Sequence, residues 1–250
     1  MSGNKLKWIA MLIMMIDHIG YGLLGPIISA HPESYGTVDN LRLTPLVIVY
    51  YAMRLVGRIA FPIFIFLLIQ GFLYSHDRIQ YFARLLLFAV ISEIPFDLVF
   101  SISTKQLNKG KIIEFAYQNV FFTLAFGLLL ITIIDVFRKI PQKGSASYVV
   151  VGTLCIIILL VVYGLQPDYG VIGALAILAA YCFKNDPKKM TAACVTVLLL
   201  SSQMEITAYL AIVLVGQYNG SRGKGNKWVF YLFYPIHLLM IVGIRILIGY

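Results

Sequence analysis

The sequence is poor in charge. Charged residues occupy only 12% of its 250 positions, about half of the roughly 25% that is usual in soluble domains. Hydrophobic residues account for 60% of the chain, and uninterrupted apolar runs of about 20 residues distinguish a membrane protein from one with a large core. Trp8–Ile28 is interrupted only by Asp17 and His18, and Val149–Leu165 has no charged residue. We therefore expect an integral membrane protein in a lipid bilayer.

Cysteine is scarce and lacks the spacing of a metal or redox site. Cys155, Cys182 and Cys194 lie singly in apolar segments, so we expect small apolar side chains and no metal site. A signal-peptide h-region followed by a small-residue cleavage site is also missing, which predicts that the first apolar run is retained as a span.

Basic residues are not gathered on one tail or face, although the net charge is +9. They are spread over short segments between apolar runs, which excludes nucleic acid as an expected partner. No repeat of about 20–50 residues is visible, so sequence symmetry does not support an inverted-repeat transporter.

The apolar runs predict an all-α fold, a single domain (residues 1–250) built as a polytopic bundle of about nine transmembrane helices. They cover residues 8–28, 46–74, 80–100, 119–137, 148–165, 169–183, 190–204, 206–217 and 228–248. The seventh and eighth could form one broken or re-entrant pair, because polar residues interrupt the run around Glu205. In the second apolar run, residues 46–74, Arg58 and Pro62 predict a short interfacial helix followed by a kinked span.

The distribution of lysine and arginine predicts how this bundle is oriented in the membrane. If the N-terminus is cytoplasmic, twelve fall on the inner side: Lys5, Lys7, Arg78, Arg138, Lys139, Lys143, Lys184, Lys188, Lys189, Arg222, Lys224 and Lys227. Four fall on the outer side: Arg42, Lys105, Lys109 and Lys111. The positive-inside rule then favours nine crossings in a bacterial-type cytoplasmic membrane, with the C-terminus outside. Loop 102–117 fits poorly, since it places three lysines outside.

Two histidines inside apolar runs are candidate functional residues, because a charge at mid-membrane costs about 3 kcal/mol or more. His18 lies about 16 Å along a helix from Lys7, near the middle of a ~30 Å hydrocarbon core. His237 lies ten residues after Lys227 on a parallel span, so the two rings should share one depth. They could converge on one polar cavity, or each could be a hydrogen-bonded histidine that holds helices together. Asp17 points about 100° away from His18, so we expect it to pair with a cation on another helix.

Buried arginines are a second group of candidates, since a guanidinium suits a carboxylate or a ligand phosphate. Arg58 and Arg84 could each pair with Asp17, Glu93 or Asp97, or bind a ligand. Arg84 lies toward the predicted cytoplasmic side, where a nucleotide-like donor would arrive.

Two polar dipeptides precede or join predicted spans. Gln118-Asn119 comes before the fourth span, and Asn219-Gly220 begins a basic turn. Glycine-rich turns can hold phosphate, but this one lacks the Walker pattern and an ordinary turn is the simpler interpretation.

Several short segments, in order over nearly the whole chain, carry a family resemblance. They are Lys5-Leu-Lys-Trp-Ile-Ala10, Met15-Ile-Asp-His-Ile-Gly20, Gly57-Arg-Ile-Ala-Phe-Pro-Ile-Phe64, Gly71-Phe72, Tyr81-Phe-Ala-Arg84, Ser92-Glu-Ile-Pro-Phe-Asp97, Gln118-Asn-Val-Phe-Phe-Thr123, Asp168-Tyr-Gly170, Tyr218-Asn-Gly220 and Phe233-Tyr-Pro-Ile-His237. With them the chain resembles the TraX family, membrane proteins associated with N-terminal acetylation of conjugative pilin. It is also similar to the wider transmembrane acyltransferases, in which a first-span histidine, a second-span Pro-Phe-rich stretch and a third-span arginine recur.

The resemblance implies an acetyltransferase that uses acetyl-CoA as donor and an amine (a peptide or pilin N-terminus) or a hydroxyl as acceptor. His18 would be the general base or would carry the acetyl group itself. The expected catalytic group is His18, Asp17, Arg58 and His237, and the expected donor- or substrate-binding group is Arg84, Glu93, Gln118, Asn119 and Asn219. Two other functions stay open: a membrane scaffold, and a proton-coupled transporter of small solutes with a relay through Asp17, His18, Glu93 and Glu205. The oligomeric state is open.

Overall fold

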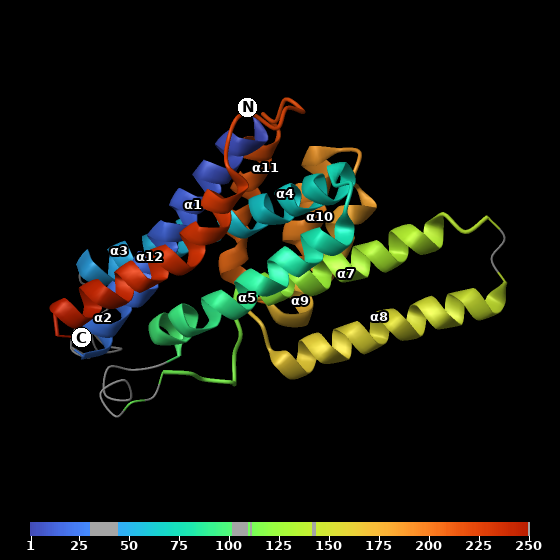
Figure 1. Ribbon diagram of the computed structural model, residues 1–250. Coiled ribbons are helices and arrows are strands. Elements are labelled where there is room, and N and C mark those ends of the chain that lie inside the picture. The colour runs from blue at the N-terminus through green and yellow to red at the C-terminus, as the bar shows by residue number, and fades with distance from the viewer. Residues whose placement is uncertain (31–44, 102–109, 111, 142–143, 250) are drawn as a thin grey trace.

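The computed structural model describes residues 1–30, 45–101, 110, 112–141 and 144–249 (Figure 1). These residues form helices joined by turns and contain no β-strand beyond one isolated bridge between Gln118 and Pro167. The helices are α1 (Gly3–Ile19), α2 (Gly25–Ala30), α3 (Pro45–Gly57), α4 (Ala60–Tyr74), α5 (Arg78–Phe100), α7 (Val120–Arg138), α8 (Ser145–Leu165), α9 (Gly170–Cys182), α10 (Pro187–Leu198), α11 (Ala211–Val215) and α12 (Lys227–Leu247). A π-helical turn, η1 (Gly20–Leu24), joins α1 to α2, and a 3-10 helix, η3 (Gln203–Leu210), precedes α11.

The predicted all-α fold is confirmed in the part of the chain that the structure describes. Five stretches of the described chain are long and apolar enough to cross a bilayer: Gly3–Ala30, Pro45–Tyr74, Val120–Arg138, Ser145–Leu165 and Trp228–Leu247. Two shorter apolar helices cover Gly170–Cys182 and Gln203–Val215.

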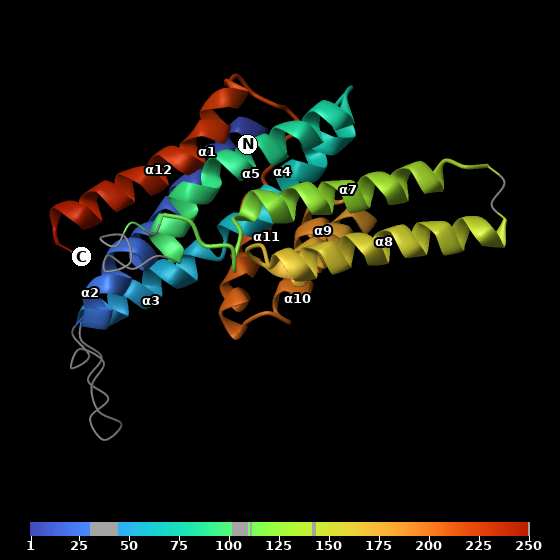
Figure 2. The ribbon, with the colours of Figure 1, turned by 60° about the horizontal axis from the view of Figure 1, so that its bottom comes forward.

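Two groups of helices make up the bundle. Figures 1 and 2 show α1, α2, α3 and α12 together at one end and α7 and α8 side by side at the other. Helices α4 and α5 connect the groups, because α4 packs on both α1 and α7 while α5 packs on both α12 and α7. One core of buried apolar side chains runs through this junction, from Leu6 and Phe66 to Leu128 and Leu238.

Polar caps define where several helices begin. Ser2, Asp77, Asn119, Asp186 and Asn226 each accept a hydrogen bond from a backbone N–H in the first turn of the helix that follows. These residue types are favoured at such positions because their side-chain oxygen satisfies an N–H that has no partner within the helix.

The second apolar run breaks where it was predicted to break. Helix α3 ends at Gly57 and α4 begins at Ala60, so Arg58 lies in the break. Helix α3 packs along α1 and η1, and α3 and α4 together make one stretch that is long and apolar enough to cross a bilayer.

The seventh and eighth runs form a broken pair, as the polar interruption predicted. Helix α10 and the η3–α11 segment pack against each other, with the break at residues 199–202. Both outer ends lie on the same side, because a side chain added at Gly216 would meet Lys188. The pair therefore returns to the side from which it starts.

Basic residues from three different segments gather around one carboxylate. Arg78, Lys139 and Lys184 all reach the carboxylate of Asp135, at 2.7, 2.9 and 3.7 Å. The N-terminus lies against the turn 217–223 through backbone hydrogen bonds. Five basic residues used for the topology lie outside the described residues, as does most of loop 102–117: Arg42, Lys105, Lys109, Lys111 and Lys143.

Candidate functional site

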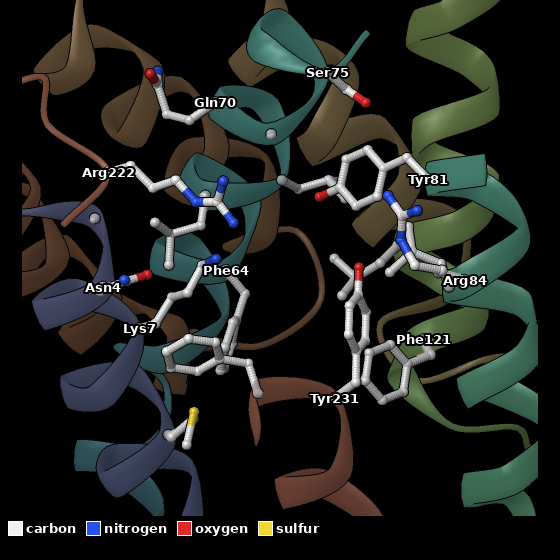
Figure 3. Close-up of a pocket in the computed structure, with 18 of the residues that line it drawn as sticks. Asn4, Lys7, Phe64, Gln70, Ser75, Tyr81, Arg84, Phe121, Arg222 and Tyr231 are labelled. Atoms are coloured by element: carbon white, nitrogen blue, oxygen red, sulfur yellow. The ribbon is translucent and has the colours of Figure 1, made fainter. Parts of the chain in front are cut away.

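A cavity of about 570 Å³ opens between α1, α4, α5, α7 and α12, a volume within the range of small-molecule sites. We call it the basic cavity, because Lys7, Arg84 and Arg222 line it and none of its described lining residues carries a carboxylate. Figure 3 shows Lys7 and Arg222 on one wall and Arg84 on the opposite wall, next to Tyr81 and Tyr231. Three cations with no acidic neighbour in the wall favour an anionic ligand.

Arg84 is the candidate that lines this cavity from α5. Its guanidinium lies 5.9 Å from the ring centre of Tyr81, and its Nε is buried without a hydrogen-bond partner among the described residues. In the described part of the chain it makes no ion pair with Asp17, Glu93 or Asp97, so that alternative is wrong for Arg84. A buried N–H without a partner is costly, and an anion in the cavity would lower this cost.

His18 and His237 meet, as their common depth predicted. Nδ1 of His18 lies 2.7 Å from Nε2 of His237, and the rings stack with centres 5.0 Å apart. Both are buried, and the His18 ring also packs edge-on against Phe100 and Tyr234. We call these two residues the histidine pair.

Hydrogen bonds determine the tautomers of both rings when the pair is neutral. His237 Nδ1 lies 2.8 Å from the carbonyl oxygen of Phe233, which can only accept, so Nδ1 carries hydrogen. Nε2 of His237 then accepts, and the bond to His18 requires hydrogen on Nδ1 of His18. Nε2 of His18 is left with a lone pair, which is the state that a general base needs.

The histidine pair lies behind the inner end of the basic cavity. Met14 and Tyr234 line the cavity, and the histidines are the next residues along the same faces of α1 and α12, because helical residues three or four apart are neighbours. The Tyr234 ring touches both histidines, with ring centres 5.9 Å and 5.6 Å away. Neither histidine lines the cavity itself, which differs from the expected chamber beside His18.

Asp17 pairs with cations on another helix, as expected. Its carboxylate accepts from Arg54 at 2.7 Å and from Arg58 at 3.1 Å, and Arg58 also contacts Glu205 at 3.2 Å. These four residues, the arginine–carboxylate network, balance two positive charges against two negative ones. Gly57 permits the contact, because a side chain there would collide with the Asp17 carboxylate.

The amide candidates hold helices together outside the basic cavity. Asn119 Nδ2 donates to Glu93 at 2.5 Å and to the carbonyl of Ala89 at 2.7 Å, and its oxygen caps α7. Gln118 is joined to the 166–168 turn through its backbone. Asn219 accepts from Ser221 within the turn that carries Arg222. These contacts connect α5 with α7 and shape the turn.

Several residues of the site were not predicted as site residues. Lys7 entered the sequence analysis as a topology marker and Arg222 as part of a basic turn, and neither Arg54 nor Tyr169 was proposed for the site. Lys7 carried a signal, since it precedes Met11, Met14 and His18 at the spacing of one helix face. The others had no local signal, because distant segments bring them to the site.

Comparison with known proteins gives one family match. The family model described as TraX protein matches residues 2–245. The chain is also 28% identical over 212 residues to a protein from Dichelobacter nodosus named "Probable fimbrial assembly protein FimC, serogroup H1", covering 77% of this chain and 82% of that protein. No solved structure matches the chain.

Proposed function

Because this chain belongs to the TraX family, we propose that it is a membrane-embedded acetyltransferase that uses acetyl-CoA and an amine or hydroxyl acceptor. The observation that carries the proposal is the basic cavity with the histidine pair behind its inner end. The relative from Dichelobacter nodosus is named for fimbrial assembly, which supports an acceptor that belongs to a fimbria or pilus.

The basic cavity suits the donor. The phosphates of acetyl-CoA would lie among Lys7, Arg84 and Arg222, where charge-assisted hydrogen bonds are strong. The thioester arm would extend along the apolar wall toward Met14 and Tyr234. These two side chains separate the cavity from the histidine pair, so they must move for the thioester to reach the rings.

His18 would act as the general base. Its Nε2 takes the proton of the acceptor as the acceptor attacks the thioester carbonyl, the C–S bond breaks, and the proton passes to the leaving thiolate. His237 would be a positioning residue, since its contact with the Phe233 carbonyl determines the tautomer of His18. The transporter alternative receives less support, because Asp17 and Glu205 are engaged by arginines and Glu93 by Asn119.

The proposed topology has a cytoplasmic N-terminus and nine helical segments. The clustering of predicted inner basic residues around Asp135 supports it. Helix α10 would be about 18 Å long and η3–α11 about 23 Å, less than the ~30 Å hydrocarbon core. We propose that this pair is re-entrant, which keeps the turn with Arg222 on the same side as the N-terminus.

The test is acetyl transfer by the purified protein in lipid nanodiscs. Labelled acetyl-CoA is incubated with candidate peptides and amines, and the wild type is compared with His18→Gln and with His76→Gln, an exposed histidine outside the site. We expect transfer to fall about 100-fold or more in His18→Gln, the usual size of a general-base contribution, and to stay unchanged in His76→Gln. Full transfer activity in folded His18→Gln, or no acetyl-CoA binding by the wild type, would reject the proposal.

A further inference from the structure

A second cavity, of about 660 Å³, lies between η1, α5, α8 and α9. We call it the aromatic cavity, because six aromatic side chains line it: Tyr21, Phe96, Phe100, Tyr117, Tyr163 and Tyr169. Asp168 is the one charged residue among its described lining residues. Its chemistry is therefore opposite to that of the basic cavity, which has three cations and no carboxylate in its described wall.

The two cavities lie on opposite sides of the histidine pair and the arginine–carboxylate network. Helix α5 lines the basic cavity as far as Leu85 and the aromatic cavity from Phe96 onward, a separation of about 16 Å along the helix axis. Phe100 in the wall of the aromatic cavity packs on His18, with ring centres 5.0 Å apart. Tyr169 in the same wall accepts a hydrogen bond from Arg58 at 3.4 Å. Each cavity is thus separated from the histidine pair by a single layer of side chains.

Charge and ring chemistry identify the kind of ligand. Asp168 supplies the one carboxyl group among the described lining residues, and the neighbouring Tyr169 accepts a hydrogen bond from Arg58 of the arginine–carboxylate network. Tyrosine and phenylalanine rings attract a cation through their faces, and a carboxylate forms a charge-assisted hydrogen bond with an ammonium group. A primary ammonium group on an apolar or aromatic body matches this wall.

We propose that the aromatic cavity is the acceptor site, that it binds a primary ammonium group next to Asp168, and that donor and acceptor approach the histidine pair from opposite ends of the bundle. This inference rests on the proposed acetyl transfer. The ammonium gives one proton to the Asp168 carboxylate, which later releases it to water. The free amine then forms the C–N bond as the C–S bond breaks, and His18 moves the second proton from nitrogen to the thiolate. The products are one amide, one thiol and one released proton.

The experiment measures binding of an ammonium probe to the protein in nanodiscs. The probes are 2-phenylethylamine, which is protonated at neutral pH, and its uncharged N-acetyl derivative, with empty nanodiscs as the blank. The wild type should bind the amine about tenfold or more tightly than the amide, the usual value of one charge-assisted contact. Asp168→Asn should abolish this preference while keeping the acceptor for the Tyr169 backbone N–H, which lies 3.1 Å from Asp168 Oδ1.

A matched control separates local from general charge effects. Asp77→Asn removes an exposed carboxylate that caps α5, and asparagine caps a helix about as well as aspartate. It should retain the wild-type preference for the amine. The inference is overturned if the wild type binds both probes equally, or if Asp168→Asn keeps the preference.

Acetyl-CoA binding, measured on the same samples, separates this inference from the proposed function. Asp168→Asn should bind acetyl-CoA like the wild type, whereas Arg84→Gln should bind it weakly and keep the preference for the amine. A wild type that prefers the amine but does not bind acetyl-CoA would refute the proposed enzyme and leave an ammonium-binding site.

Discussion

Removing the charge of Asp17 without changing its size tests the arginine–carboxylate network. In Asp17→Asn, Arg58 keeps Glu205 at 3.2 Å, whereas Arg54 loses the only ion pair that it makes in the described part of the chain. The side chains of Asp17 and Arg54 are only 10% and 20% exposed, so the arginine charge would be left poorly solvated. Removing one partner of a buried pair costs about 3–5 kcal/mol, and we expect a loss of this size in the free energy of unfolding.

Arg54→Gln should cost less, because Asp17 keeps its contact with Arg58 at 3.1 Å. The loss of one charge-assisted hydrogen bond is about 1.5–3 kcal/mol. In the double variant no charge is left without its partner, so the two effects should not add. We expect a coupling energy of about 1.5–3 kcal/mol between the two positions.

The assay is reversible unfolding in mixed detergent, followed by the fluorescence of Trp8 and Trp228, the two tryptophans of the chain. The matched control is the pair Asp186 and Lys189, 3.8 Å apart with side chains 44% and 70% exposed. Asp186→Asn keeps the cap of α10, and the coupling in this pair should be about 0–1 kcal/mol. If the coupling between positions 17 and 54 is no larger than in the control, the network does not hold α1 to α3 as inferred.

Two further variants test other parts of the site. Arg84→Gln should raise the Kd for acetyl-CoA about tenfold or more, and this effect should shrink at high salt. The control is Lys189→Gln, which removes an exposed basic side chain and should leave the Kd unchanged. Equal affinities of the two variants for acetyl-CoA would exclude Arg84 from the donor site. Asn119→Ala should destabilise the protein by about 2 kcal/mol or more, because it removes a helix cap and leaves Glu93 without its amide partner. The control is Asn226→Ala, which removes only an exposed cap and should cost about 1 kcal/mol. A smaller loss of stability for Asn119→Ala than for Asn226→Ala in the same unfolding assay would contradict the described contacts.

Local rules predicted the parts of the site that depend on position along one helix. The rise per residue placed His18 and His237 at one depth, and the high energy of a charge in lipid predicted a cationic partner for Asp17. The same rules could not decide between an ion pair and a ligand for Arg84, because that choice depends on which side chains other helices bring next to it. Arg54 and Arg58 lie one turn apart and meet Asp17, whereas Arg84 faces a cavity.

Composition and periodicity determined by themselves that this chain is a helical membrane protein, because lipid admits only segments whose backbone hydrogen bonds are made internally and whose length matches the bilayer. Only the tertiary structure decided that Lys7, Arg84 and Arg222 line one cavity, that α10 and η3–α11 return to the side from which they start, and that Asp168 lies in the wall of a second cavity. These contacts join different helices and turns, so they depend on how the helices pack, and the sequence of one segment does not say which side chains another segment brings next to it.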